Sequence, residues 1–139
     1  MYKDIEYLDS AEKISVDMVS GFFVGWPNPP DENTLIEILK KSHKIVIAKK
    51  GNKIIGFITA ISDGILSAYI PFFEVLPDFQ NLGIGAELLH QMKEKLKDIY
   101  MVDLICDSGI ESYYKKLGFT KSSGMILRNY EFQNGKRNK

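Results

Sequence analysis

Hydrophobic and polar residues along the chain follow two different periods, which predicts a mixture of helices and strands. In the first part, Ile14 and Met18 lie at helical spacing and predict a helix over about 11–19. Leu35 and Leu39 belong to the apolar face of a second helix. Three closely spaced prolines precede this second helix, so we expect an irregular, proline-stiffened loop between the two.

The middle of the chain favours strands. A short alternating stretch at the start predicts an edge strand, and longer apolar stretches separated by glycine-containing turns predict three more strands. The turn around Gly51 is close to a usual hairpin sequence, so consecutive strands should run in opposite directions. The predicted strands are residues 4–8, 44–49, 53–61 and 65–76.

The last part returns to helical spacing, because apolar residues recur every four positions over about 83–97. An apolar stretch over 100–107 predicts a buried strand, residues 109–118 predict a short helix that ends at Gly118, and 123–132 predict a closing strand. The whole order predicts an α+β fold, with a central, mostly antiparallel twisted sheet covered by helices. We expect one domain over 1–133, followed by a mobile basic tail over 134–139.

Composition excludes several classes of protein. The 139 residues include 18 basic and 18 acidic side chains, so the zero net charge argues against a strongly basic nucleic-acid binder. The polar, acidic start argues against export, and the lack of a long apolar run argues against membrane insertion. We therefore expect a cytoplasmic protein. The single cysteine, Cys106, offers no metal-binding cysteine pair, so we expect no metal.

The stretch "LPDFQNLGIGAELL" places two glycines between a predicted strand and a predicted helix, an arrangement typical of anion sites. It lacks the lysine and hydroxyl of the phosphate-cradling loop, and Leu88 stands where the dinucleotide fingerprint needs its third glycine. A third pattern, Gln/Arg-x-x-Gly-x-Gly/Ala after a strand ending in V-x-P, is matched completely. The residues that match it are Val75, Pro77, Gln80, Gly83 and Gly85.

This pattern resembles the acetyl-coenzyme A signature of the GNAT acetyltransferase superfamily, and "ESYYKKLGF" resembles its second landmark. The resemblance implies acetyl-coenzyme A as acyl donor, a primary amine as acceptor, and a monomer or homodimer. "GWPNPP", "ISDG", "CDSGIESYYKKLGF" and "GM" more narrowly resemble plant chloroplast serotonin N-acetyltransferase-like proteins and their bacterial relatives. Donor-binding roles pass by resemblance to Val75, Leu76, Gln80, Asn81, Leu82, Gly83, Ile84, Gly85, Ala86, Ser108 and Tyr114.

Three residues are candidates for general acid–base catalysis. Tyr114 stands at the tyrosine position of the superfamily, which implies a general acid that returns a proton to the leaving thiolate. Many relatives have an asparagine where this chain has Asp107, so Ser108 could make the donor contact instead. Glu74 and Asp107 are the carboxylates nearest the expected cleft, and either is a candidate base or a solvated side chain.

The acceptor side is expected near the aromatic, proline-rich loop. Its candidate contacts, together with two residues of the neighbouring strands, are Phe22, Phe23, Trp26, Asp63 and Tyr69. A hydrophobic acceptor such as an arylalkylamine fits these side chains, whereas a structural lid or a dimer contact would use them differently. Protein lysine or a polyamine is the alternative acceptor, and a non-catalytic acyl-coenzyme A-binding module is the alternative class.

Overall fold

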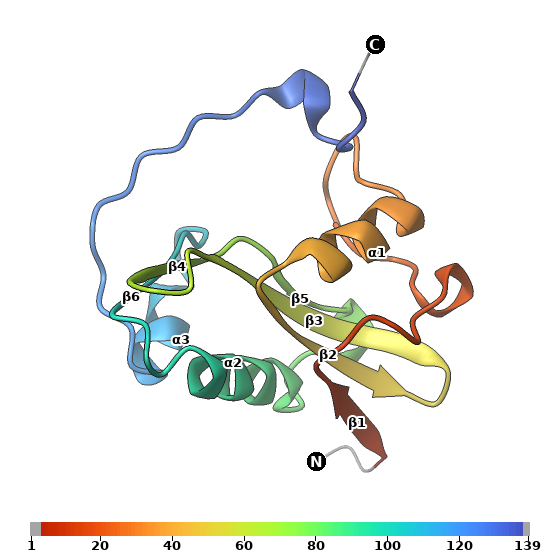
Figure 1. Ribbon diagram of the computed structural model, residues 1–139, viewed down its shortest axis with the longest axis horizontal. Coiled ribbons are helices and arrows are strands. Elements are labelled where there is room, and N and C mark those ends of the chain that lie inside the picture. Colours follow the sequence, from red (N-terminus) through yellow and green to blue (C-terminus); the bar gives the residue numbers. More distant parts are fainter. Residues whose placement is uncertain (1–3, 138–139) are drawn as a thin grey trace.

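The computed structural model of the protein describes residues 4–137, so the first three residues and the last two residues of the predicted tail lie outside the described part. Six strands, two longer helices and one short helix form the regular structure (Figure 1). The strands are β1 (Ile5–Leu8), β2 (Lys44–Lys50), β3 (Lys53–Ser62), β4 (Ser67–Ile70), β5 (Phe73–Val75) and β6 (Met101–Leu104). The helices are α1 (Glu32–Lys41), α2 (Ile84–Lys95) and α3 (Glu111–Lys116), with 3₁₀ turns η1 (Val16–Met18), η2 (Pro77–Phe79) and η3 (Tyr130–Phe132).

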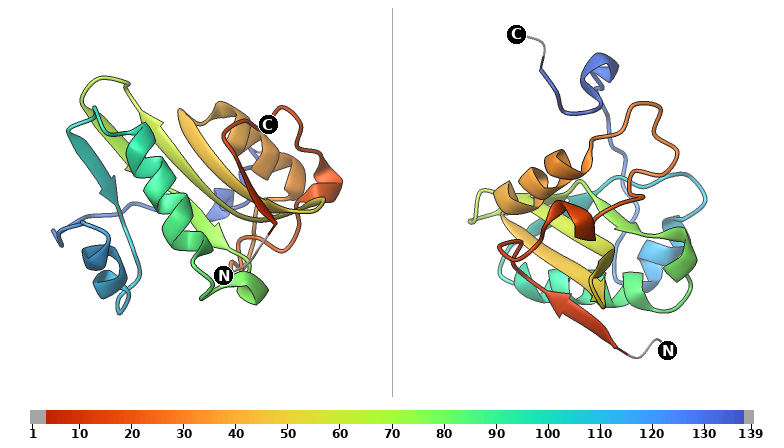
Figure 2. Two further views of the ribbon diagram at one scale, coloured as in Figure 1. Left: turned by 90° about the horizontal axis from the view of Figure 1, so that it is seen from below. Right: turned by 90° about the vertical axis from the view of Figure 1, so that its right-hand side faces the viewer.

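The strands form one sheet in the order β1-β2-β3-β4-β6, and β5 also pairs with β3. Every pairing is antiparallel except that of β4 with β6, which is parallel. Helices α1 and α2 cover opposite faces of the sheet (Figures 1 and 2). This is the mixed α+β, mostly antiparallel architecture that the sequence predicts.

Alternation along the central strands builds a core on each face. Ile47 and Phe57 point to the face covered by α1, while Val46 and Ile58 point to the face covered by α2. Leu88, with no exposed surface, anchors α2 on the second face. Burying one such side chain stabilises the fold by about 1.5–3 kcal/mol.

The predicted helix over 11–19 is wrong, because only η1 is helical there. Ile14 and Met18 are buried as their spacing suggested, with 6% and 7% of their surface exposed. The side-chain hydroxyl of Ser15 donates instead to the Asp17 carboxylate. Such local bonds compete with the helix backbone, and β-branched valines at 16 and 19 lower helix propensity further. The first apolar face is therefore buried by a loop.

The predicted strands change in two places. The strand expected over 65–76 is divided into β4 and β5 by Pro71 and Phe72, since proline cannot donate to a ladder. The closing strand expected over 123–132 is also wrong, because residues 120–129 have no regular structure. β6 is shorter and less buried than expected, with alternate residues exposed. The strands over 4–8, 44–49 and 53–61 and the helix over 83–97 are confirmed with small shifts of their ends.

Within residues 4–137, none of the helices has the length and hydrophobicity needed to cross a bilayer.

Candidate active site

The centre of the site is the connection from β5 to α2. Val75 pairs with Gly56 of β3, and the Leu76 N–H donates to the Ile55 carbonyl over 2.9 Å, which fixes the end of β5. After η2, the chain turns through Asn81 at φ +61° and Gly83 at φ +85°. Both residue types tolerate this left-handed region, so the two positive φ values turn the chain directly into α2.

Backbone donors are left open at the start of α2. The first hydrogen bond inside the helix runs from the Glu87 N–H to the Gly83 carbonyl over 3.1 Å. Residues 84–86 lie in the first helical turn, where N–H groups have no acceptor within the helix. These donors and the positive end of the helix dipole favour an anion. The geometry therefore fits the phosphate group of an acyl donor held by backbone.

The two glycines of the motif are required for different reasons. A methyl group added at Gly83 would meet no atom within 4 Å, so glycine is favoured there for its positive φ, which strains most other residues. A methyl group added at Gly85 would lie 3.1 Å from the Tyr113 hydroxyl and 3.5 Å from the Phe73 ring. Gly83 thus sets the direction of the turn, whereas Gly85 lets side chains from β5 and α3 approach the helix.

The Gln80 side chain stabilises this turn from within the chain. Its amide Nε2 donates to the Val75 carbonyl over 3.0 Å. Asn81 and Leu82 follow it, and neither side chain makes a polar contact within residues 4–137. In the described residues, the N–H groups of the turn are therefore the main donors.

Helix α3 brings two tyrosines to the start of α2. The Tyr114 ring lies edge-on to Phe73 at 6.4 Å and to Phe119 at 5.9 Å between centroids. Burial is the main cause that raises the pKa of Tyr114 to about 12, and the neighbouring Cys106, Tyr113 and Asp107 charges add to it. Burial also raises the pKa of Tyr113. Both phenols are consequently protonated at neutral pH and can donate.

A divergence of strands opens the sheet beside these tyrosines. β4 and β6 pair in parallel as far as Ile70 and Leu104. Beyond this point β5 stays with β3, while the chain after β6 turns away toward α3. In the described residues, β5 has no strand on its outer edge. This edge leaves backbone groups available to an extended ligand that runs toward α2.

The two candidate carboxylates differ in their surroundings. Glu74, in the middle of β5, accepts hydrogen bonds from the Phe23 N–H at 2.8 Å and the Val24 N–H at 3.3 Å. Asp107 is exposed just after β6, and its charge acts on Tyr114. Ser108 is exposed beside it. Glu74 therefore joins β5 to the aromatic loop, and Asp107 is the carboxylate close to Tyr114.

The aromatic loop packs against the sheet around Phe23, which is 4% exposed and has φ +60°. Trp26 is 39% exposed and lies 4.9 Å from the Phe23 ring. Phe22 meets Phe57 of β3 at 5.1 Å. Among these described aromatic side chains, Trp26 has the most surface exposed to solvent. Phe72, which the sequence patterns did not single out, joins the same cluster at 5.8 Å from Phe23.

The remaining acceptor candidates lie in the β3–β4 turn and on β4. Asp63 accepts hydrogen bonds from the N–H groups of Ile65, Leu66 and Ser67 in the β3–β4 turn, and these bonds lower its pKa to about 2. Tyr69 lies on β4 opposite Ile61 and is 36% exposed. Asp63 is thus used to hold its own turn. Across residues 4–137, no three His, Cys, Asp or Glu side chains gather as a metal site would require.

The open donors of α2 and the free edge of β5 fit the acyl donor of an acetyltransferase, which is the class that the family match gives. More particularly, the chain belongs to the GNAT family, because residues 28–130 match its acetyltransferase (GNAT) domain. It is 34% identical over 127 residues to an uncharacterized N-acetyltransferase, ycf52, of Pyropia yezoensis, covering 86% of this chain and 72% of that protein.

Further similarities agree with the family. GCN5-related N-acetyltransferase 2, chloroplastic, of Arabidopsis thaliana is 29% identical over 117 residues, covering 69% of this chain and 45% of that protein. A crystal structure of a Deinococcus radiodurans R1 protein, described as an acetyltransferase, superposes on this chain with a TM-score of 0.94 and 40% sequence identity. That superposition covers 98% of this chain and 96% of the other.

Proposed function

We propose that the protein transfers an acetyl group from acetyl-coenzyme A to a primary amine by direct attack within a ternary complex. The proposal rests on two neighbouring groups of donors. The first is the open N–H groups of residues 84–86, and the second is the two phenols of Tyr113 and Tyr114. The first group suits the pyrophosphate of the donor, and the second suits the reacting thioester. Donor contacts are proposed for β5 and for residues 80–86, with Ser108 as a further contact.

The proposed reaction needs one proton donor and one proton acceptor. The amine nitrogen attacks the thioester carbonyl carbon, the carbon–sulfur bond breaks, and the amide forms. Tyr114 gives its phenolic proton to the coenzyme A thiolate, and the proton that leaves the amine nitrogen restores the phenol. An amine that arrives as ammonium must first lose a proton, and we assign this step to Asp107 through water. None of these steps uses a metal.

Glu74 is proposed as a positioning residue. Its carboxylate already accepts two backbone N–H groups of the aromatic loop, so its oxygens are occupied in holding that loop against β5. The contact places the loop beside the donor strand, where the acceptor must enter. Trp26, which is 39% exposed, lies 6.4 Å from the partly buried Phe72, so this side of the aromatic cluster is the one open to an acceptor.

An arylalkylamine is the proposed acceptor, because an aromatic ring can stack on such side chains. The narrower resemblance to serotonin N-acetyltransferase-like proteins supports it. Protein lysine is the second candidate, supported by 31% identity over 109 residues to histone acetyltransferase TAP1 of Glycine max, of which the chain covers 47%. A reducing compartment such as the cytoplasm suits the free Cys106.

The test is an amine panel with acetyl-coenzyme A, read by release of free coenzyme A. The panel contains arylalkylamines, polyamines and lysine-containing peptides, and a reaction without amine measures hydrolysis. We expect the highest kcat/KM with an arylalkylamine. Higher kcat/KM with peptides would support the second candidate. Binding of acetyl-coenzyme A with no release above the amine-free rate would identify a non-catalytic binding module instead.

A further inference from the structure

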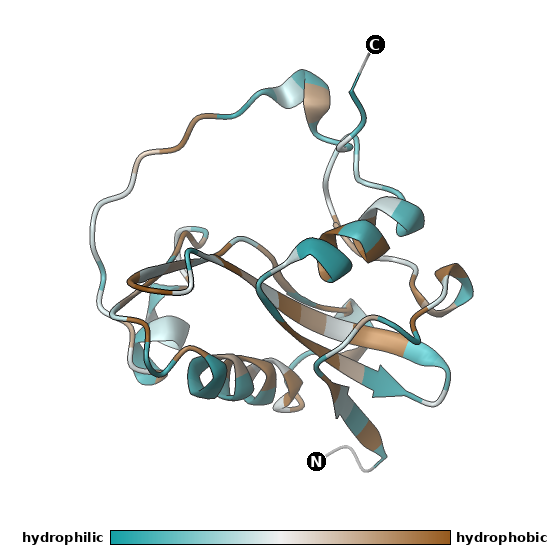
Figure 3. Cartoon of the chain, in the orientation of Figure 1, coloured by the Kyte–Doolittle hydropathy of each residue, from teal (hydrophilic) through white to brown (hydrophobic). Residues whose placement is uncertain are grey.

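The C-terminal arm, defined as residues 120–129, is exposed along its whole length although its centre is apolar. Met125 is 97% exposed, Ile126 58% and Leu127 87%. Figure 3 shows this hydrophobic stretch on the part of the chain that lies far from the body. Contiguous exposed apolar residues in a soluble protein mark an interaction surface.

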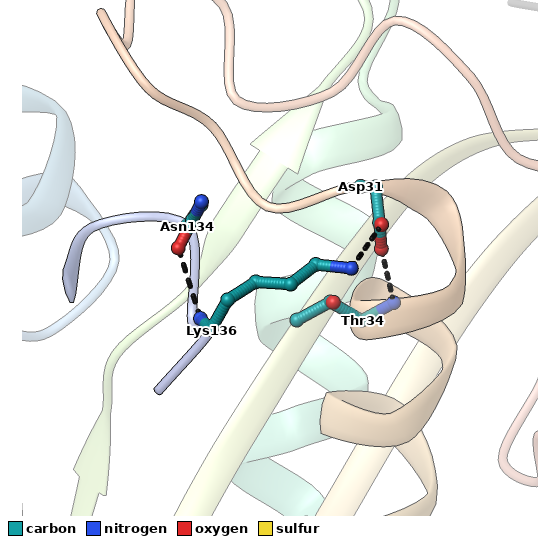
Figure 4. A network of polar contacts seen from close by, with 4 residues as sticks. All are labelled: Asp31, Thr34, Asn134 and Lys136. Atoms are coloured by element: carbon teal, nitrogen blue, oxygen red, sulfur yellow. Dashed lines mark hydrogen bonds and ion pairs between the residues drawn. The ribbon is translucent and has the colours of Figure 1, made fainter. Parts of the chain in front are cut away.

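The arm is attached to the body at both ends. At its start, the Phe119 N–H donates to the Tyr114 carbonyl over 3.0 Å. Past its end, the Gln133 side chain accepts from the Asn28 N–H over 2.8 Å. The Lys136 ammonium lies 2.8 Å from Asp31 at the start of α1 (Figure 4). The arm is therefore a strap between α3 and α1 (Figures 1 and 2), fixed in its course but unpaired along its length.

Strand β6 offers the matching surface. It pairs with β4 on one edge, and within the described residues no strand pairs with its other edge. Beside it lies a cavity of about 440 Å³. The cavity is lined by Tyr114, the proposed general acid, but by none of residues 80–86, so it adjoins the proposed donor site at Tyr114. Its apolar lining comes from Val102, Leu104, Ile105, Tyr114, Phe119 and Ile126.

The arm of the same chain lines one side of this cavity with residues 120–124 and Ile126, but it does not pair with the free edge of β6 in the described residues. No hydrogen bond joins the backbone of 120–128 to β6 in the described part of the chain. An extended arm and an unpaired strand edge thus belong to the same molecule.

We propose that a second copy of this chain covers both features, with the arm of each copy lying along the free edge of β6 in the other. Two-fold symmetry satisfies both copies at once, and exchange of identical elements is a common route to dimers. Arg128 in the arm and the exposed Asp103 of β6 provide opposite charges for this contact. The arm of the partner also forms a wall beside Tyr114.

The first test is the variant Leu127→Glu, followed by light scattering and sedimentation. In an isolated chain this side chain is 87% exposed, so the substitution should leave folding unchanged. We expect the wild type to have twice the chain mass of 15.8 kDa, and the variant to dissociate at least tenfold more readily. Val16→Glu on η1, at a position 44% exposed and outside the arm, is the matched control and should remain dimeric.

A second experiment locates the contact between copies. One chain carries Cys106→Ser and a nitroxide attached at Asn129→Cys, and it contains no ¹⁵N. It is mixed with a second chain that is labelled with ¹⁵N and carries no nitroxide. We expect broadening of the ¹⁵N amide signals of Met101–Leu104, which can arise only between copies. Dimers without this broadening, a dimer unaffected by Leu127→Glu, or a wild type that stays monomeric at all concentrations would each overturn the proposal.

Discussion

The turn into α2 and the aromatic loop over 21–26 use the same chemical group in opposite ways. Each contains a residue with positive φ, and each presents consecutive backbone N–H groups. At the start of α2 these donors have no acceptor in the helix, whereas in the aromatic loop Glu74 accepts from Phe23 and Val24. Open donors can hold a ligand, while occupied donors hold the loop itself.

This difference explains why the two regions differ in composition. The turn into α2 depends on glycine, because Gly83 has a positive φ and a side chain at Gly85 would press on the Tyr113 hydroxyl. A loop held from within can carry large side chains even at φ +60°, where Phe23 is strained. Burial of Phe23 and its bond to Glu74 oppose that strain. The donor side is therefore formed mainly by backbone, and the acceptor side by side chains.

The largest loss of activity is expected from a change at Tyr114. The leaving thiolate needs a proton, and the backbone N–H groups of the α2 turn cannot supply one at neutral pH. Tyr114→Phe should lower kcat by about 10²- to 10⁴-fold and leave the affinity for acetyl-coenzyme A nearly unchanged. Steady-state kinetics and calorimetric titration measure the two quantities. Tyr113→Phe is the matched control with a smaller expected loss, and equal kcat in wild type and Tyr114→Phe would remove Tyr114 from the reaction.

Next comes Gly85→Val, which tests whether the α2 turn is open for a ligand. Loss of a charged hydrogen bond removes about 1.5–3 kcal/mol, so KM for acetyl-coenzyme A should rise about 10- to 100-fold. The added side chain would also press on the Tyr113 hydroxyl. The double variant Gly85→Val/Tyr113→Phe relieves that contact, and it should keep the raised KM. Recovery of the wild-type KM would attribute the effect to Tyr113 alone.

Glu74 tests the other side of the comparison. Glu74→Ala should lower the free energy of unfolding by about 1–3 kcal/mol, because two N–H groups lose their acceptor. Glu74→Gln retains one accepting oxygen and should lose less stability, as denaturant unfolding can measure. A Glu74→Gln variant with wild-type stability and little activity would show instead that Glu74 is the general base.

The smallest effect concerns alkaline pH. Burial is the main cause that raises the pKa of Tyr114 from 10.0 to about 12. Between these two values the phenol is neutral in the folded protein but ionised in the unfolded chain. Its contribution to stability is fully present below pH 10 and is lost between about pH 10 and 12. Between pH 9 and 11, wild type should lose more unfolding free energy than Tyr114→Phe. Identical losses would contradict the raised pKa.

Local sequence patterns predicted the backbone elements that surround the candidate site. The glycine spacing, the apolar period of α2 and the antiparallel hairpin of β2 and β3 each follow from neighbouring residues. The bond from Glu74 to Phe23 spans 51 positions and has no sequence pattern. Phe72 joined the aromatic cluster because Pro71 interrupts the strand, a consequence visible only after the strands are paired.

The two incorrect elements also have physical explanations. Residues 11–19 carry a helical apolar spacing, but side-chain hydrogen bonds and β-branched residues favour a loop that buries the same Ile14 and Met18. Residues 123–132 carry the composition of a strand, yet a strand needs a partner, and within the described residues no strand pairs with the arm. A composition that predicts a strand does not identify the chain with which it pairs.

The central claim is that the open N–H groups at the start of α2 bind acetyl-coenzyme A. The most direct measurement is a titration of ¹⁵N-labelled protein with acetyl-coenzyme A, followed by amide chemical shifts. We expect the largest saturable shifts at Ile84, Gly85 and Ala86, with small shifts at Phe23 and Val24, whose N–H groups are already bonded to Glu74. Saturable binding that leaves the amides of 84–86 unchanged would contradict the account.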